Sequence, residues 1–371
     1  MSILEYPIAK TASCPFDPPK ELRDMQEQAP LVRVRLWDGS TPWLVTRYAD
    51  QRALLGDARV SSNPMAPGYP LQTASQITAQ RQGLSFISMD DPEHSRQRRM
   101  VTAPFAIKRI EVMRPGVQKI VDDLIDTMLA GPRPVDLVEA FALPVPSLVI
   151  CQLLGVPYSD HDFFQANTRV LVRTSTPDEE RLAARDRIYD YLDELVGRKL
   201  AEPQEDLLSE LAERITTGEL TRRDVSQMAV LLLVAGHETT ANMIALGTFA
   251  LLQHPDQLDK LRAAEDPKEI AGQTIRAGEG LIFPNEIGNR DPEAFDNPDE
   301  LDLSRNARHH VAFGFGVHQC LGQPLARMEL QVVYGTLYRR IPALRLAIDA
   351  ADVPLKHDGF IYGVYELPVT W

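Results

Sequence analysis

The chain has 371 residues, of which 44% are hydrophobic and 25% are charged, as is ordinary for a globular protein with a sizeable core. The net charge of −13 argues against a general nucleic-acid binder, and the three widely spaced cysteines form neither a disulfide framework nor a metal-finger pattern. The N-terminus has no basic region followed by an apolar core, and the apolar stretch at residues 228–235 is too short to span a bilayer. We therefore expect a cytoplasmic protein that binds neither nucleic acid nor membrane.

The N-terminal part of the chain predicts a hairpin, a short helix and a long loop. Residues 31–36 alternate between apolar and polar types, and residues 43–46 predict a strand that pairs with them across a turn at residues 38–40. A helix is expected over residues 49–55. Residues 61–83 are rich in Ser, Pro, Gly, Gln and Thr, so we expect a loop, and a loop of this length is usually functional.

Helical patterns dominate from residue 93 to residue 252, with breaks at residues 131–134 and around residues 174–178. Strand-like segments return further on, at residues 272–275, 280–283 and 359–362. The chain contains no repeats, low-complexity tracts or linkers. These patterns predict one domain spanning residues 1–371, mainly α with a small β region.

Residues 313–322 place Cys320 in a loop just before a helix predicted over residues 324–330. A thiolate at a helix N-terminus is stabilised by the helix dipole and by free backbone N–H groups. Glycine permits backbone angles and close approaches that other residues resist. The loop has three glycines, at Gly314, Gly316 and Gly322. It suits an axial sulfur ligand below a flat macrocycle, with Phe313 packing nearby, although a buried structural cysteine is the alternative interpretation.

A second motif, Ala-Gly-His-Glu-Thr-Thr at residues 235–240, lies within a long helix that opens with a capping box at residues 221–224. Gly236 weakens the helix and the Thr239 hydroxyl competes for backbone carbonyls, which together predict a local widening. A hydroxyl backed by the carboxyl of Glu238 suits proton relay.

The position of this motif along the helix predicts its burial. Leu232 and Ala235 precede Thr239 at helical spacing on an apolar face, so we expect Thr239 to be buried. The alternative is a polar patch that faces solvent. A third helix begins near residue 91 and carries His94 and Arg98 four residues apart, on one face. That face is either an anion-binding site or a solvated basic surface.

Taken together, the motifs resemble the cytochrome P450 family. Residues 313–322 match its haem-binding signature Phe-x-x-Gly-x-x-x-Cys-x-Gly, and residues 235–239 match its oxygen-activation motif Ala/Gly-Gly-x-Asp/Glu-Thr. The sequences of these motifs are most similar to those of soluble actinomycete monooxygenases that act on secondary metabolites, steroids or xenobiotics. The resemblance implies the cytochrome P450 fold.

It also implies haem b with Cys320 as the iron ligand, Thr239 steadying dioxygen and Glu238 controlling proton supply. The other haem-binding residues implied by the resemblance are His94, Arg98, Ala235, Gly236, Phe313, Gly314, His318 and Gly322. The substrate would be an apolar small molecule that receives one oxygen atom. The pocket positions implied for it are Ile77, Leu84, Phe86, Leu171, Val172, Leu232, Ile282 and Ile361.

Electrons would come from NAD(P)H through a ferredoxin reductase and a ferredoxin. A basic cluster on an acidic protein would steer an acidic ferredoxin toward the site. The candidate residues of this cluster are Arg96, Arg99, Lys108, Arg109 and Arg327.

The chain departs from the family pattern at one place. Residues 241–313 contain no Glu-x-x-Arg, the motif of a helix that in the family pins the haem loop, and a segment is missing around residues 262–264. We expect a break in the backbone between Lys260 and Ile270. This departure favours, as alternatives, a catalytically impaired haem- or ligand-binding protein. A haem-thiolate enzyme that uses peroxide or nitric oxide is a further alternative, which the intact Glu238-Thr239 pair argues against.

Overall fold

The computed structural model describes residues 3–8, 10, 16–72, 85–172, 176–261, 279–303, 305, 307, 309–357 and 361–371. Its contacts define two compact units, each described here by itself. The first comprises Met1–Ser95 and His254–Leu321, and the second comprises Arg96–Gln253 and Gly322–Trp371. Each unit needs two distant stretches of sequence, so neither is a continuous segment. That one domain spans residues 1–371 stays a prediction.

The first unit contains a four-stranded sheet in the order β1-β2-β3-β5. Its strands are β1 (Leu4–Glu5), β2 (Leu31–Arg35), β3 (Trp43–Val45) and β5 (Leu281–Ile282). The predicted hairpin is confirmed: β2 and β3 pair antiparallel with Val32 opposite Leu44, and Gly39 adopts a φ of 83° in the turn. β1 and β5 pair in parallel with β2 and β3 respectively, so β5 joins this sheet from far along the chain.

Short helices complete the first unit, namely α1 (Lys20–Gln28), α2 (Tyr48–Leu55), α11 (Pro255–Leu261) and α12 (Asn285–Gly288). The α2 helix confirms the helix expected over residues 49–55. Apolar residues of α1, the sheet and α12 share one core cluster that includes Leu22, Leu44 and Ile287. Residues 61–72 contain neither helix nor strand, as predicted, and the rest of that predicted loop lies outside the described residues.

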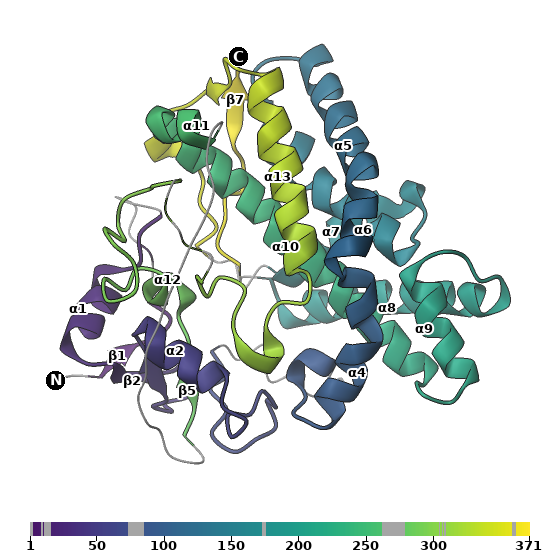
Figure 1. The fold of residues 1–371 in the computed structure, drawn as a ribbon, viewed down its shortest axis with the longest axis horizontal. Helices are drawn as coiled ribbons and strands as arrows, with labels where there is room; N and C mark the ends of the chain where they lie inside the picture. The colour runs from purple at the N-terminus through teal and green to yellow at the C-terminus, as the bar shows by residue number, and fades with distance from the viewer. Residues whose placement is uncertain are drawn as a thin grey trace. The chain divides into compact units, whose positions relative to one another are not determined.

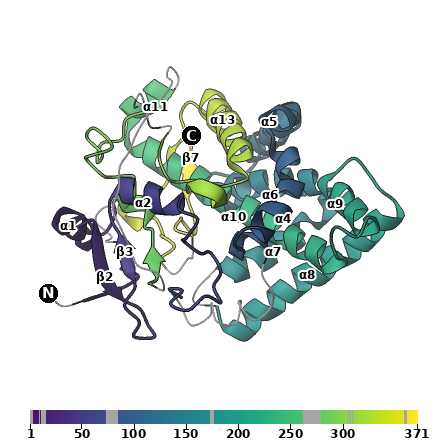
Figure 2. The ribbon, with the colours of Figure 1, turned by 60° about the horizontal axis from the view of Figure 1, so that its bottom comes forward.

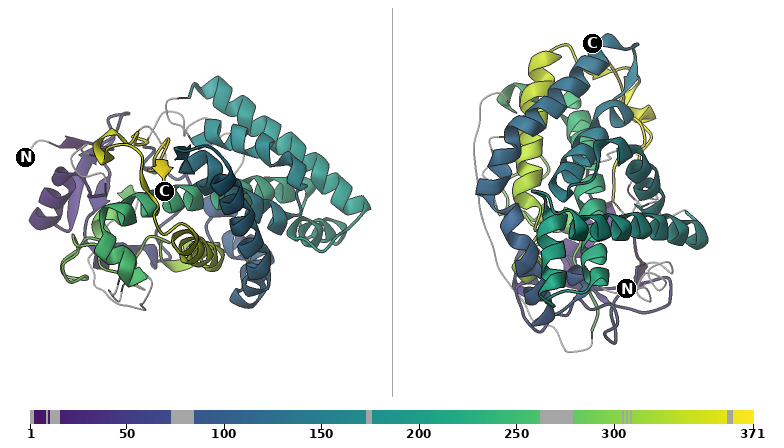
Figure 3. Two further views of the ribbon diagram at one scale, coloured as in Figure 1. Left: turned by 90° about the horizontal axis from the view of Figure 1, so that it is seen from above. Right: turned by 90° about the vertical axis from the view of Figure 1, so that its right-hand side faces the viewer.

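The second unit is mainly helical. Its helices are α5 (Ile107–Ala130), α6 (Pro144–Leu154), α7 (His161–Val172), α8 (Asp178–Ala201), α9 (Leu207–Thr216), α10 (Arg222–Gln253) and α13 (Gln323–Arg340), with α4 (Glu93–Thr102) starting at the end of the first unit. α13 runs alongside α5 (Figures 1 and 3). α10 packs against α6 and α8, and α7 lies against α8 (Figure 2).

A three-stranded antiparallel sheet in the order β4-β7-β6 belongs to the second unit. Its strands are β4 (Val135–Asp136), β6 (Arg345–Leu346) and β7 (Pro368–Thr370). The strand predicted at residues 359–362 is wrong where it can be compared, because Ile361 and Tyr362 lie in an irregular segment. The strand predicted at residues 272–275 lies outside the described residues. The prediction of a mainly α fold with a small β region is confirmed.

α10 begins with the predicted capping box. The Thr221 N–H donates to the Asp224 carboxylate at 2.8 Å, and the Asp224 N–H donates to the Thr221 hydroxyl at 3.1 Å. Among the described helices, α10 alone is long and apolar enough by composition to cross a membrane, and 56% of its apolar window is buried inside the protein. That burial is what the core helix of a globular unit shows.

Candidate functional site

Cys320 ends a tight loop of the first unit. Its N–H donates to the Phe313 carbonyl at 2.8 Å, and the Gly314 N–H donates to the Val311 carbonyl at 2.8 Å. Gly314 and Gly316 adopt φ angles of 67° and 73°, in the left-handed region that favours glycine. The sequence prediction that this loop needs glycines is therefore confirmed at two of its three positions.

The third glycine, Gly322, lies at the start of a helix and not within the loop. Gly322 is the N-cap of α13 with a φ of −79°, which any residue can adopt. Cys320 stands three residues before the first helical residue, Gln323, and is exposed, so its sulfur is open to a metal ion. Cys151 is buried, and burial raises the pKa of its thiol to about 12, so it stays protonated and makes a poor ligand. Of these two cysteines, only Cys320 can offer a thiolate.

Helix α2 supports the loop from within the first unit. The Arg52 guanidinium lies 4.1 Å from the ring centroid of Phe315 and donates to the Tyr48 hydroxyl at 3.0 Å. A Cβ atom on Gly316 would meet the Leu55 carbonyl oxygen at 2.0 Å, which only a backbone shift could relieve. The close approach and the cation–π contact fix the loop against the C-terminal end of α2.

His94 and His318 lie together in the first unit, with ring centroids 4.0 Å apart. His94 is 1% exposed, and neither of its ring nitrogens has a hydrogen-bond partner among the described residues, although Nδ1 lies 3.4 Å from Asp91 Oδ1. Buried polar atoms without partners are rare and call for an explanation. A haem propionate is an acceptor of suitable chemistry, and His318 is only two residues from Cys320. The residues present therefore fit haem.

The other implied haem-binding residues lie in the second unit. Arg98 is half-buried on α4, and Ala235 is exposed on α10. A Cβ atom on Gly236 would lie 2.9 Å from the Ile150 side chain of α6. Glycine at this position therefore permits close packing of α10 against α6, a reason that the sequence did not reveal.

Thr239 departs from two expectations. It is exposed rather than buried, because Ala235, Thr239 and Met243 follow one another at four-residue spacing along an exposed face of α10. Its hydroxyl donates to the Ala235 carbonyl at 2.7 Å, so the expected competition for a backbone carbonyl is confirmed. α10 nevertheless continues as an α-helix through the motif, and the expected widening is wrong.

Glu238, the next residue in the motif, is 1% exposed. Its Oε2 atom accepts from the Asn242 side-chain amide at 3.2 Å and lies 3.8 Å from the Lys356 ammonium. Its Oε1 atom lies 3.8 Å from Nδ1 of His237. The acid and the alcohol of the motif therefore have different surroundings: the carboxylate is buried, whereas the hydroxyl is exposed.

Glu238 also lines a cavity of about 310 Å³ within the second unit. The charged residues of its wall are Asp136, Glu139, Arg169, Glu238, Lys356 and Glu366. Ile361 also lines it and is the only one of the implied substrate-pocket residues that does so among the described residues. The charged side chains offer the polar partners that buried water needs, whereas Val138, Leu143 and Ile361 make the rest of the wall apolar.

The remaining implied pocket residues are scattered over both units. Phe86 and Leu232 are buried, Leu171 is half-buried near the end of α7, and Ile282 belongs to the core cluster of the first unit. The side chain of Val172 and residues Ile77 and Leu84 lie outside the described part of the structure. Their contribution to a substrate pocket stays a prediction.

Sequence reasoning missed three residues around Glu238. The motif assigns no role to His237, and no local pattern in the sequence points to Thr168 or Lys356. His237 is buried and its Nδ1 atom lies 3.0 Å from the Thr168 hydroxyl. The position of His237 within the motif was the only signal in the sequence, because the contacts with Thr168 and Lys356 are made only by folding.

An exposed thiol just before a helix, in a loop whose His318 ring lies against the buried His94 imidazole, fits the class of proteins that bind haem through a cysteine thiolate. The chain belongs to the cytochrome P450 family: the family model described as Cytochrome P450 matches residues 20–266 and 262–341. Haem is the cofactor of this family, and the protein is a cytochrome P450 monooxygenase.

Curated relatives and solved structures agree with this assignment. The chain is 51% identical to Cytochrome P450 GfsF of Streptomyces halstedii, in an alignment that covers 99% of this chain and 96% of GfsF. The crystal structure of GfsF matches this structure with a TM-score of 0.92, covering 99% of this chain and 100% of the GfsF chain. It is 47% identical to pentalenic acid synthase of Streptomyces avermitilis over 97% and 96% of the two chains. The structure of the mycinamicin VIII C21 methyl hydroxylase MycCI of Micromonospora griseorubida, bound to mycinamicin VIII, matches with 39% identity and a TM-score of 0.91 over all of both chains.

The comparisons also locate an interruption of the family pattern. The two matches to the family model meet at residues 262–266, where the sequence predicts a missing segment. The alignment with GfsF extends over 397 residues although this chain has 371, so GfsF contains residues that have no counterpart here. The predicted break in the backbone between Lys260 and Ile270 falls almost wholly on residues 262–278, which lie outside the described residues.

Proposed function

We propose that this monooxygenase inserts one oxygen atom of dioxygen into an apolar small molecule, most consistently a secondary metabolite. The observation that carries the proposal is the exposed Cys320 thiol in a loop whose His318 ring lies against His94, a buried residue whose Nε2 has no hydrogen-bond partner among the described residues. This combination suits a thiolate-bound haem with an anchored propionate. We further propose that the protein works in the cytoplasm.

In this proposal Cys320 holds the haem, while His94, His318 and Arg98 bind its propionates by charge-assisted hydrogen bonds. Thiolate-ligated haem iron, when bound, supplies the dioxygen chemistry, with the thiolate favouring O–O cleavage. Phe313, Gly314 and Gly322 shape the loop around the thiolate. Ala235 gives the exposed face of α10 a small side chain, and Gly236 lets the same turn of α10 pack against Ile150 of α6.

The chain's own part in the reaction is proton supply and positioning. The exposed Thr239 hydroxyl donates a hydrogen bond to the Ala235 carbonyl. It is also accessible to a ligand on that face of α10. The Glu238 carboxylate borders the charged cavity, which suits uptake of protons from water there. Because the two groups are not hydrogen-bonded to each other, a water molecule or a turn of the carboxylate must connect them.

The substrate class rests on the relatives. MycCI hydroxylates a methyl group of mycinamicin VIII, and pentalenic acid synthase is named for its product. Bacterial members of the family in general draw electrons from ferredoxin and a ferredoxin reductase, and we propose the same chain here, starting from NAD(P)H. Arg99 and Lys108 are exposed in the second unit and suit an acidic partner.

A catalytically impaired haem- or ligand-binding protein is a second candidate, favoured by the interruption of the family pattern at residues 262–266. A peroxide- or nitric-oxide-using enzyme is less favoured, because the Glu238-Thr239 pair is intact. Turnover with NAD(P)H, reductase and ferredoxin separates these candidates from the monooxygenase, since only the monooxygenase forms a product that contains an atom of dioxygen.

The test of thiolate ligation uses the reduced, carbon-monoxide-bound protein. We expect the red-shifted Soret band of thiolate haem in the wild type and in Cys151→Ala, and its loss in Cys320→Ala, because Cys151 is buried and protonated. A band that survives Cys320→Ala would overturn the ligand assignment. Steroids, macrolides and small aromatics, screened by spectral shift and by mass spectrometry of products, then test the substrate class.

A further inference from the structure

Helix α2 holds the chain ahead of the cysteine at two points. We call residues 313–322 the cysteine loop. The Arg52 guanidinium lies 4.1 Å from the ring centroid of Phe315, inside this loop. One turn earlier on α2, the Tyr48 hydroxyl donates to the carbonyl of His309, just before the loop, at 2.7 Å. Tyr48 and Arg52 are four residues apart and so share one face of α2. Both contacts therefore fasten the chain to the same face of one helix.

Arg52 joins these two contacts into one arrangement. The Tyr48 hydroxyl has a single proton, which it donates to the His309 carbonyl, so its oxygen accepts the hydrogen bond that Arg52 donates at 3.0 Å. A planar guanidinium donates hydrogen bonds from its edge and stacks on an aromatic ring with its face. One side chain thus contacts both the residue that holds His309 and the ring of Phe315.

α2 is a firm support for these contacts, because it is tied to the rest of the first unit. Tyr48 is buried and packs edge-on against Phe295, with ring centroids 5.4 Å apart. The Tyr48 N–H donates to the Asp291 carboxylate at 2.9 Å. At the other end of the helix, a Cβ atom on Gly316 would lie 2.0 Å from the Leu55 carbonyl oxygen. This close approach stops the loop from moving toward α2, so its position depends on what stops it from moving away.

The position of Phe315 determines that of the cysteine. Phe315 has extended backbone, with a φ of −153°, and leads directly into the turn Gly316–His318. The Cys320 N–H then returns to the Phe313 carbonyl, at 2.8 Å. The backbone of the cysteine is therefore hydrogen-bonded to a residue two positions from Phe315. A shift of the Phe315 ring away from α2 moves the cysteine with it.

We propose that Arg52 is a positioning residue for Cys320. By holding Phe315 against α2, it keeps the thiolate at the place where haem iron binds, and it thereby sets the fraction of bound haem that has thiolate ligation. The inference deepens the proposed function and rests on it, since it requires Cys320 to be the iron ligand. It adds to the predicted site a residue that is remote from the cysteine in sequence and that no motif marks.

The test is the difference spectrum of the reduced, carbon-monoxide-bound protein, which separates haem with thiolate ligation from haem without it. We expect Arg52→Met to lower the ratio of the two bands about fivefold, as the loss of one cation–π contact of ordinary strength would. Arg52→Lys keeps a cation near Phe315 and should retain most of the wild-type ratio. Phe315→Leu should act like Arg52→Met, and combining the two should lower the ratio no further, because both remove the same interaction.

Arg33→Met is the matched control. The Arg33 guanidinium lies 3.9 Å from the ring centroid of Trp43, so this variant loses a cation–π contact of the same kind on the sheet of the same unit. It should keep the wild-type ratio even where its Tm falls as much as that of Arg52→Met. All spectra are recorded well below the Tm of each variant, so that unfolded protein does not contribute to them.

An unchanged ratio in Arg52→Met overturns the inference. An equal fall in Arg33→Met also overturns it, because general loss of stability would then govern ligation, and so do additive effects of Arg52→Met and Phe315→Leu. If Arg52→Met binds no haem, Phe315→Leu and Arg52→Lys give the same comparison. A wild type without the thiolate band contradicts the proposed function itself, whereas variants that match a wild type with that band contradict only the positioning role.

Discussion

At the residue scale, the acid and the alcohol of the motif point from α10 into different surroundings. Successive residues of an α-helix point about 100° apart, so neighbours in sequence face different surroundings. Glu238 enters the buried charged cluster, and Thr239 stays on the exposed face with Ala235 and Met243. The sequence predicts that both residues matter, but their separation depends on what packs around α10.

The Thr239 hydroxyl gives a direct test of proton delivery. We expect Thr239→Ala to bind haem normally and to divert reducing equivalents into hydrogen peroxide, lowering product per NAD(P)H by about an order of magnitude, because the group that passes protons is lost. Thr239→Ser keeps a hydroxyl and should retain most of the coupling. Product and peroxide are measured against NAD(P)H consumed. Unchanged product yield in Thr239→Ala would refute this role.

The residues that surround Glu238 show why sequence reasoning stopped where it did. Glu238 and Thr239 stand in a recognisable motif, whereas Thr168 and Lys356 lie on other elements and carry no local pattern. Their contacts with His237 and Glu238 exist only after α7 and the C-terminal segment pack onto α10. Long-range polar pairs of this kind cannot be read from spacing along one chain.

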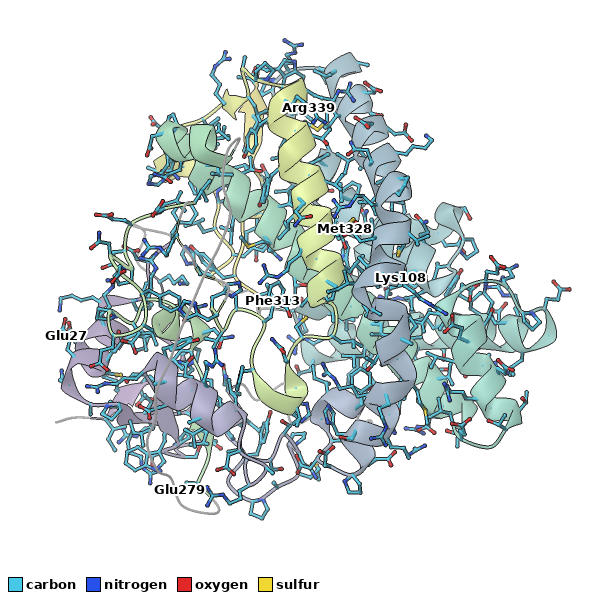
Figure 4. The ribbon with its side chains drawn as sticks, in the orientation of Figure 1. Glu27, Lys108, Glu279, Phe313, Met328 and Arg339 are labelled. Atoms are coloured by element: carbon cyan, nitrogen blue, oxygen red, sulfur yellow. The ribbon has the colours of Figure 1, made fainter. Side chains whose placement is uncertain are left out.

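At the scale of the element, α13 connects the cysteine loop to the core of the second unit. Figure 4 labels Met328 and Arg339 along this helix, next to α5. Met328 and the adjacent Glu329 are both buried, and Glu329 Oε2 has no hydrogen-bond partner among the described residues. Burial raises the pKa of Glu329 to about 8. The helix therefore carries a carboxyl group that is neutral in the folded protein over much of the physiological range.

Stability should depend on pH through this carboxyl. Its pKa is 4.5 in the unfolded chain and about 8 in the folded one, so between these values the folded protein binds a proton that the unfolded chain has lost. The stabilising contribution is complete below pH 4.5 and falls as pH rises toward 8, by at most roughly 5 kcal/mol. Glu329→Gln abolishes this dependence, so its Tm relative to the wild type should increase steadily across that window.

The control for this experiment is Glu213→Gln, at an exposed position of α9. Its Tm relative to the wild type should stay constant with pH, because the substitution leaves the buried Glu329 carboxyl in place. Thermal unfolding followed by circular dichroism in a series of buffers gives all three curves. A difference between Glu329→Gln and the wild type that stays flat from pH 4.5 to pH 8 would contradict the raised pKa.

At the scale of the whole molecule, the electron donor needs a surface. The N-terminal end of α5 combines two strongly exposed apolar side chains, Ile107 at 70% and Val112 at 78%, with the exposed cations Arg99 and Lys108 nearby in sequence (Figure 4 labels Lys108). Apolar groups beside cations are typical of transient docking surfaces, because charge steers the encounter and apolar contact holds it. Arg109, in contrast, is paired with Glu210.

Charge reversal tests this surface. We expect Arg99→Glu/Lys108→Glu to slow ferredoxin-driven reduction by about tenfold at low ionic strength and to weaken its dependence on salt, since steering of an acidic partner is lost. Reduction by dithionite should not change. Lys119→Glu, at an exposed position further along α5, is the matched control and should behave nearly as the wild type. Equal ferredoxin kinetics in the double variant and the control would exclude this docking surface.

Much of the fold followed from local patterns, because the hairpin, α2, α10 and α13 each have a clear periodicity, cap or turn. The family resemblance supplied the rest of the architecture. The burial of Thr239 was predicted wrongly because periodicity identifies an apolar face but not whether another element covers it. The contact of Arg52 with Phe315 joins segments that are remote in sequence, and so it was visible only in the folded chain.

The interruption at residues 262–266 leads to the last prediction. In the family, the helix that carries Glu-x-x-Arg pins the haem loop. In this chain the Arg52 guanidinium of α2 lies over Phe315 of that loop, and the Tyr48 hydroxyl donates at 2.7 Å to the carbonyl of His309, which precedes the loop. Inserting the corresponding segment of GfsF at residues 262–264 should restore paired polar groups, each stabilising by roughly 1 kcal/mol. We expect more haem retained per protein and a higher Tm.

A glycine-serine insertion of equal length at the same position is the control, and it should lower the Tm slightly because a longer loop costs entropy without adding contacts. Haem content is measured from the absorbance of the reduced pyridine complex, and Tm from thermal unfolding of the loaded protein. If the GfsF segment and the glycine-serine insertion act alike, the α2 contacts of Arg52 and Tyr48 are sufficient to hold the haem loop, and this chain works without the Glu-x-x-Arg helix.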